Sequence, residues 1–397
     1  MAVSNTIGSA RGHWAGIVTA GFLVVLVSYA GPLLIYLQAA HAMGASPAEF
    51  SSWVFAISVA AGISSIVLSA WTRAPVATAW SAPGTVLLIS LGSGLPFAEV
   101  VGAFVTAALV ILALGVTGLF DRIVAAIPRA VADGMMAGIL FGFGVHAMEG
   151  IAAAPWVMAG LLAAYFALSA AIPRYTMLAL LALGLALSWQ VYGVAPDSAG
   201  LALATPRLTW PSLSLGATLS LALPLVLTTL TGQFLPGLTI LRASGYEVAA
   251  RPIIVVTALA SVAAAFLGGI TTALAAITLA LCAGPEAHPD PGRRWLAGVA
   301  AGVFFCLGGI FAGSIAGLLA LLPVEIIAML AGLALLGAIL RSMGDMLARP
   351  EDAQAGLVTF IVTVTGVTIH GINAAFWGVV VGIGAVLVTR AVRRLRP

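Results

Sequence analysis

Apolar runs long enough to cross a lipid bilayer follow one another along almost the whole chain. Hydrophobic residues make up 62% of the 397 residues and charged residues only 7%, whereas soluble domains carry roughly 25% charged residues. A membrane helix needs about 20 mainly apolar residues, and Gly, Pro and Arg divide the chain into about fourteen such stretches. The sequence therefore predicts an all-α polytopic membrane protein with almost nothing left for a soluble domain.

The expected spans form two sets of seven. The first set is 15–40, 48–69, 75–92, 97–118, 123–146, 152–171 and 174–192. The second set is 212–242, 248–266, 269–283, 294–311, 315–341, 354–370 and 372–389.

Arginine supplies all 16 basic residues, and its placement predicts the orientation. With a cytoplasmic N-terminus and fourteen spans, every arginine except Arg207 falls at or near the inner side, as the positive-inside rule requires. We therefore expect a multi-pass protein of the inner (cytoplasmic) membrane with both termini cytoplasmic. The basic tail "TRAVRRLRP" is typical of a topology anchor or an anionic-lipid contact, so a nucleic-acid partner is not expected.

A weak internal repeat relates the two sets of spans. Aligning Pro32 with Pro236 places Tyr29 opposite Gln233, and "IPRAVADGMMAG" from Ile127 is similar to "LPVEIIAMLAG" from Leu322. Seven spans separate the partners, and an odd number inverts the second copy in the membrane, as in many secondary transporters. Recurrence of Leu, Ala and Gly by chance is the alternative.

Two short, interrupted segments strengthen the repeat. "TRAPVATAWSAPGTVLLIS" from Thr72 is the third span and "GGITTALAAITLALCAG" from Gly268 is the tenth. Segments broken by Gly and Pro at matching places indicate a transporter's binding site. Half-helix starts near 81–84 and 269–273 would aim free N–H groups at one pocket, giving positive potential without a single Lys or Arg. An anion is the expected guest.

The strings "TGQFLPGLTILRASGYE", "GGITTALAAITLALCAGPEAHPD" and "GILFGFGVHAM" resemble the benzoate:proton symporter (BenE) family. The likeness covers essentially the whole chain and is densest from Leu223 to Gly309. The family is distantly similar to uracil and sulfate or bicarbonate transporters with a 7+7 inverted repeat. The resemblance implies a core domain (residues 1–120 and 212–312) that moves against a gate domain (121–211 and 313–397).

The resemblance also implies import of benzoate or a similar aromatic carboxylate by proton symport. A sulfate-like anion and a nucleobase-like substrate stay open as alternatives, and an anion channel would need a continuous polar pore. No span carries a metal-ligand constellation or a nucleophile with a base, so neither an enzyme nor a cofactor or metal is expected. The oligomeric state is open, with a homodimer among the alternatives.

Gln233 is the leading candidate ligand. Its amide N–H₂ would bind the carboxylate, while Pro236 and Gly237 would distort the helix and let it approach the tenth span closely. Structural glue between helices is the alternative for this glutamine.

The half-helices supply further candidates. Thr271, Thr272 and Ala273 would offer backbone N–H groups, and Ser81 would do the same in the opposing segment, although Ser and Thr in membrane helices often bond only to their own turn. Three aromatic side chains could flank the ring or simply pack in the core: Tyr29, Phe234 and Trp80.

Proton coupling has four candidates. The uracil-transporter relatives carry carboxylates on spans 8 and 10, and this chain has none there. Asp133 and Glu325 are expected inside spans 5 and 12, where carboxylates are functional by default, although either could lie at a helix end. His146 and His370 fall at predicted outer ends of spans, suited to proton entry or simply solvated. A protonated substrate is the remaining alternative.

Overall fold

Long apolar helices dominate the computed structural model, which describes residues 2–91, 94–193, 200–276 and 278–395. Within those ranges, nine helices are long and apolar enough to cross a membrane. Three further apolar helices are shorter: Pro155–Ala171, Ala250–Ala265 and Ala353–Val364. The chain is a mostly helical, polytopic membrane protein, as the sequence predicts. The count of fourteen spans stays a prediction.

Prolines start several helices in the first half of the chain. Pro32, Pro47 and Pro155 each open a helix, where the missing N–H has no partner to lose. The described elements in order are α1 (Ala2–Ala30), α2 (Pro32–Ala42), α3 (Pro47–Thr72), β1 (Thr78–Trp80), α4 (Ala82–Leu91), α5 (Phe97–Thr117), α6 (Phe120–Ala126), α7 (Arg129–Ala153), α8 (Pro155–Ala171), the 3₁₀ turn η2 (Pro173–Tyr175) and α9 (Thr176–Tyr192).

The second half begins with one membrane-length helical run, Leu215–Ala243. Two π-helical turns interrupt that run, so it comprises α10 (Leu215–Ala217), η4 (Thr218–Ala222), α11 (Leu223–Thr229), η5 (Leu230–Phe234) and α12 (Leu235–Ala243). It is followed by α13 (Ala250–Ala265), β2 (Thr272–Leu274), α14 (Leu279–Ala283), η6 (Pro291–Arg293), α15 (Trp295–Ile310), α16 (Ala312–Leu319), α17 (Val324–Leu347), α18 (Ala353–Val364) and α19 (Ala374–Leu395).

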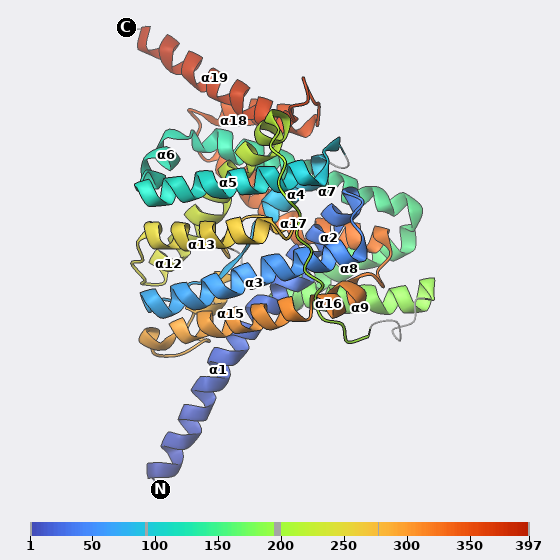
Figure 1. Ribbon diagram of the computed structural model, residues 1–397, viewed down its shortest axis with the longest axis vertical. Helices are drawn as coiled ribbons and strands as arrows, with labels where there is room; N and C mark the ends of the chain where they lie inside the picture. Colours follow the sequence, from blue (N-terminus) through green and yellow to red (C-terminus); the bar gives the residue numbers. More distant parts are fainter. Residues whose placement is uncertain (1, 92–93, 194–199, 277, 396–397) are drawn as a thin grey trace.

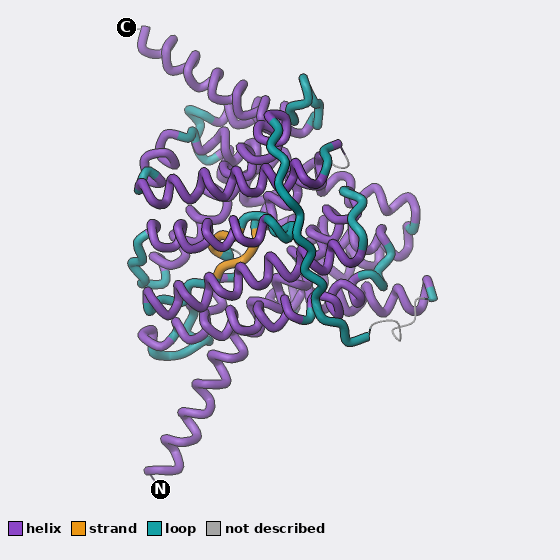
Figure 2. Tube along the Cα trace, in the orientation of Figure 1, coloured by secondary structure: helices purple, strands orange, loops and turns teal. Residues whose placement is uncertain are grey.

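A two-stranded antiparallel ribbon lies in the middle of the helices (Figure 2). Ala79 of β1 faces Ala273 of β2, and the N–H of Ser81 donates to the carbonyl of Thr271 at 2.9 Å. Each strand leads toward a short helix, α4 or α14. The pairing satisfies backbone groups that lipid could not. The third and tenth segments are therefore broken and meet each other, as predicted.

The helices pack in two groups that meet near this ribbon. In the first group α3 packs against α13 and α15, and α13 packs against α5, so that the four run side by side (Figure 1). In the second group α7 packs against α17, α18 and α19. The ribbon belongs to the first group, since β1 packs on α3 and β2 on α13. The division into core and gate domains stays a prediction.

An extended connector, residues 200–214, crosses the first group over a long path (Figure 2). The N–H groups of Ala204, Thr209 and Ser212 donate to carbonyls at the ends of α15, α13 and α5, each at 2.8 Å. A Cβ on Gly102 of α5 would collide with the backbone of Ser212. The connector is thus bound to three helices of one group.

The two prolines related by the repeat act differently. Gly31 leaves helical geometry with φ −122° and ψ −78°, so α1 ends and α2 starts at Pro32. The helix continues through Pro236, and the π-turn η5 ends at Phe234, two residues before this proline. A π-turn accommodates the bond that proline cannot make. The predicted distortion is therefore a wide turn and not a break.

Helix boundaries differ from expectation at the twelfth span in a way that affects the site. In place of one helix over 315–341, α16 ends at Leu319 and α17 runs from Val324 to Leu347. Pro323 sets the start of α17 and Pro128 sets that of α7. Arg341 consequently lies six residues before the end of its helix.

Candidate functional site

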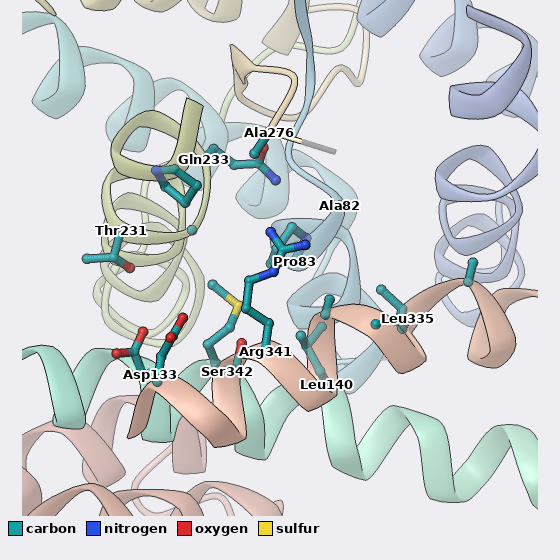
Figure 3. Close-up of a pocket in the computed structure, with 17 residues that line it drawn as sticks. Ala82, Pro83, Asp133, Leu140, Thr231, Gln233, Ala276, Leu335, Arg341 and Ser342 are labelled. Carbon is teal, nitrogen blue, oxygen red and sulfur yellow. The ribbon is translucent and has the colours of Figure 1, made fainter. Parts of the chain in front are cut away.

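A cavity of about 180 Å³ lies where the two helix groups meet. The start of α4, the η5–α12 turn and the residue Ala276 after β2 line one side. One face each of α7 and α17 lines the other (Figure 3). The side chains that line it include Pro83, Met136, Gln233, Leu335 and Arg341.

Gln233 places its amide in this cavity. The side chain is only 5% exposed and extends toward Ala276 (Figure 3). Within the described ranges the amide forms no hydrogen bond to protein. Burying an amide without a partner costs roughly 1–3 kcal/mol by mutational measures, and π-turns such as η5 occur frequently at functional sites. The amide is therefore available to a ligand or to water.

Ser81 caps α4 at the edge of the cavity. Its Oγ accepts from the N–H of Gly84 at 3.2 Å, and its carbonyl accepts from the N–H of Thr85 at 3.0 Å. Ala82 and Pro83, the first residues of α4, line the cavity. The predicted half-helix start is confirmed here, with the Ser81 hydroxyl used as a cap.

The second of the two broken membrane segments (the second crossing), which contains β2 and α14, is built differently from the prediction. The N–H of Thr272 donates to Ser261 Oγ at 2.8 Å, the Thr271 hydroxyl bonds that of Thr229 at 3.1 Å, and Ala273 is fully buried in β2. The helix α14 starts at Leu279 and not within 269–273. The paired strand takes up the residues expected to open the helix.

The predicted aromatic residues lie beside the cavity. Trp80 shares a small adjoining cavity with Gln233, and its ring stacks on Tyr29 with 6.1 Å between centroids. Its indole Nε1 is buried and has no partner in the described part of the chain. Phe234 is fully buried and packs edge-on against Phe120 at 6.2 Å. The apolar side chains that line the main cavity come from elsewhere, above all from α7 and α17: Met136, Leu140 and Leu335.

Three charged side chains line the cavity: Asp133 from α7, and Arg341 and Asp345 from α17. All three also line a wider adjoining pocket of about 580 Å³, together with Arg129, Arg242 and Arg349. The expectation of a site without Lys or Arg is therefore wrong, because Arg341 reaches it. The displaced boundary of α17 hid this residue, and Pro323 as a helix start was the signal that could have revealed it.

Comparison with known protein families identifies the class of membrane protein to which this cavity belongs. The family model described as "Benzoate membrane transport protein" (BenE) matches residues 13–388. A benzoate membrane transport protein of Acinetobacter baylyi is 46% identical over 363 residues, which cover 91% of this chain and 92% of that one. The chain belongs to the BenE family.

Further relatives agree with this membership. The inner membrane protein YdcO of Escherichia coli is 39% identical over 91% of this chain and 93% of its own length. Among solved structures, the transmembrane domain of the cyanobacterial bicarbonate transporter BicA has a TM-score of 0.59 at 16% identity, covering 95% of this chain and 96% of that one. The inward-facing murine anion transporter Slc26a9 also gives 0.59 at 12% identity, covering 96% and 68%. These structures share the fold, and the BenE protein is a membrane transporter.

The other proton-coupling candidates of this BenE protein lie away from the cavity. Glu325 is the second residue of α17, sixteen residues from Arg341 and so about 24 Å along the helix. His146 pairs with Glu149 at 3.1 Å, and its side chain is 78% exposed. His370 lies in a turn with φ +51°. The structure brings only Asp133 of the four to the cavity.

Close backbone approach holds the cavity wall together in this BenE protein. A Cβ added to Gly237 would lie 2.5 Å from Leu274 Cβ of β2, and one on Gly232 would lie 2.6 Å from Met136 Cε of α7. Real Cβ atoms are essentially never found below 3.0 Å. The expected close approach of the eighth span to the tenth is confirmed, and it depends on Gly237.

Proposed function

We propose that this BenE protein is a secondary active transporter that imports benzoate or a similar aromatic carboxylate together with a proton. The observation that carries the proposal is the unpaired amide of Gln233, which faces a mainly apolar cavity at the start of α4. The 46% identity to a benzoate membrane transport protein supports the same substrate. The proposal is of a transporter and not of an enzyme.

The cavity offers complementary surfaces to the two ends of such a substrate. Met136, Leu140 and Leu335 would contact the ring, and the Gln233 amide would donate to the carboxylate. The N–H of Ala82 is one of the unbonded donors at a helix start, where the helix dipole also favours negative charge. A hydrated inorganic anion such as sulfate would gain little from the apolar surfaces. A sulfate-like anion is therefore the weaker candidate, and so is a nucleobase-like molecule, which has an aromatic ring but no carboxylate for the Gln233 amide.

Coupling and movement complete the proposal. Asp133 is the proposed proton carrier, because it lines both the cavity and the wider pocket. The first helix group would act as the core and the second as the gate, so that moving one against the other exposes the cavity to alternate sides. The relative named an inner membrane protein and the arginine distribution support an inner-membrane location with both termini cytoplasmic.

The decisive experiment follows labelled benzoate into vesicles that contain the purified protein, with and without an inward proton gradient. Uncharged benzoic acid crosses lipid by itself, so the initial rate must be corrected with protein-free vesicles of the same composition. We expect a saturable, protein-dependent rate that increases with the gradient. Counterflow of labelled against unlabelled benzoate at uniform pH tests transport without any gradient.

The outcomes separate the parts of the proposal. Saturable counterflow that ignores an imposed proton gradient would retain benzoate as substrate and reject proton symport. No protein-dependent flux of benzoate, with sulfate exchanged instead, would reject the aromatic carboxylate. An Asp133→Asn variant that still couples fully would reject Asp133 as the proton carrier.

A further inference from the structure

Arg341 is the one cationic side chain among the described residues that line the inner cavity. It extends from α17 toward Pro83 and Gln233 (Figure 3). Within the described part of the chain it forms neither an ion pair nor a hydrogen bond. The other arginines of the wider pocket lie outside this cavity. A cation thus faces the Gln233 amide, and no anion among the described residues is paired with it, although Asp133 and Asp345 line the same cavity.

We propose that Arg341 binds the substrate carboxylate from the side opposite Gln233 and the start of α4. A guanidinium group presents paired N–H donors in a planar fork that matches a carboxylate. Met136, Leu140 and Leu335 line the same cavity, and the attraction between opposite charges is stronger beside apolar surface than in bulk water. The inference rests on the proposed function, since it takes the substrate to be a carboxylate bound in this cavity.

The position of Arg341 on α17 matters as much as its charge. The cavity-lining residues of this helix recur at helical spacing along one face: Ala334, Leu335, Gly337, Ala338, Arg341, Ser342 and Asp345. This face belongs to the second helix group, whereas Gln233, Ala82 and Ala276 lie on the opposite wall. A carboxylate held by both walls would therefore bridge the two groups. A neutral aromatic molecule could occupy the apolar part without making that bridge.

An alternative role for Arg341 is that of a cytoplasmic topology anchor near a helix end. An anchor needs only a positive charge near the membrane surface, and so Lys would replace it fully. A carboxylate ligand also needs the fork, and so Lys would replace it only in part. The two roles therefore predict different results for the same conservative substitution.

The test measures equilibrium binding of benzoate and of its neutral analogue benzamide to the purified protein by titration calorimetry. Arg341→Gln should weaken benzoate binding at least 30-fold, about 2 kcal/mol at 1.4 kcal/mol per factor of ten, and leave benzamide binding within about twofold. Arg341→Lys should fall between wild type and Arg341→Gln. Arg242→Gln removes one charge from the wider pocket only, and should stay within about twofold of wild type.

Each result decides something distinct. Unchanged benzoate affinity in Arg341→Gln, or an equal loss in Arg242→Gln, would overturn the inference and leave the proposed function intact. Full affinity in Arg341→Lys would also overturn it in favour of an anchor. If wild type binds sulfate and not benzoate, the proposed function fails, and the inference then stands or falls on whether Arg341→Gln loses sulfate. Should Arg341→Gln fail to fold by thermal unfolding without ligand, the Arg341→Lys comparison decides alone.

Discussion

The two broken segments at the centre of the protein follow the same path but are held very differently. In β1 the hydroxyl of Thr78 bonds those of Ser64 and Ser65 at 2.7 and 2.8 Å and donates to the carbonyl of Ala61 at 2.8 Å. At the matching first position of β2 the Thr272 hydroxyl is buried with no partner in the described chain. The first threonine of β1 is therefore held to its supporting helix by its side chain, whereas that of β2 is held only by its backbone, through Ser261.

The short helices that follow β1 and β2 also differ, in their length and in their capping. The first, α4, has ten residues and a serine cap directly after the strand. The second, α14, has five residues and no side-chain cap, and a turn separates it from β2. An inverted repeat therefore fixes the path of the chain but not its polar network. We expect the first crossing to be the stiffer wall of the cavity, because the Thr78 hydroxyl is bonded whereas the Thr272 hydroxyl has no partner among the described residues.

Gly237→Val should have the largest effect. The new side chain would push α12 away from Leu274 and separate the second crossing from the Gln233 turn. We expect benzoate binding to be lost, as measured by ligand-induced thermal stabilisation. Gly142→Val is the control, because nothing lies within 4 Å of its Cβ position. Wild-type binding by Gly237→Val would show that the close approach is dispensable.

Thr78→Val comes next and tests the anchored crossing. It removes three hydrogen bonds and leaves buried serine hydroxyls short of a partner, which should lower the free energy of unfolding by about 2 kcal/mol. Thermal unfolding of the detergent-solubilised protein measures the loss. A melting temperature equal to that of wild type would mean that the serine network does not stiffen this wall.

Gln233→Ala compares the two residues that the repeat aligns. Removing the amide should weaken benzoate binding about tenfold, or 1.4 kcal/mol, without a fall in melting temperature. Tyr29→Phe is the counterpart from the first half, and it should leave affinity unchanged because the Tyr29 hydroxyl already bonds Ser58 at 2.7 Å. Equal losses of affinity in both variants would contradict the asymmetry of the site.

Thr272→Val should have the smallest effect. Among the described residues the hydroxyl has no partner to lose, and the Thr272 N–H keeps its bond to Ser261. We expect the free energy of unfolding to change by less than about 0.5 kcal/mol. The same thermal unfolding series measures it beside Thr78→Val. A loss as large as that of Thr78→Val would erase the difference between the crossings.

Much of this architecture can be predicted from the hydrophobic pattern of the sequence. Apolar runs and Gly/Pro interruptions predict the membrane helices, the inverted repeat and the two broken segments, because lipid tolerates few other backbone arrangements. Gln233 stands out for a related reason, since a buried amide in a membrane helix needs a partner. These features depend on local composition, which can be read directly from the amino-acid sequence.

Other features depend on where each helix begins and ends and on which strands pair, and the hydrophobic pattern of the sequence does not determine these. Pairing in β2 uses the residues expected to open a half-helix, and only the partner strand determines this. A shift of six residues at the end of α17 moved Arg341 from the predicted membrane surface into the cavity. The prolines at positions 32 and 236 look alike in sequence, yet one ends a helix and the other follows a π-turn.

The extended connector has a mechanical consequence. Residues 200–214 are hydrogen-bonded to the ends of α15, α13 and α5, so sliding these helices along one another would break the hydrogen bonds of this one short segment. We expect spin labels placed on any two of them to keep a constant separation throughout the working cycle, while labels on α5 and α18 change theirs. In the proposed transport cycle, the interface that moves would then pass through the proposed substrate cavity.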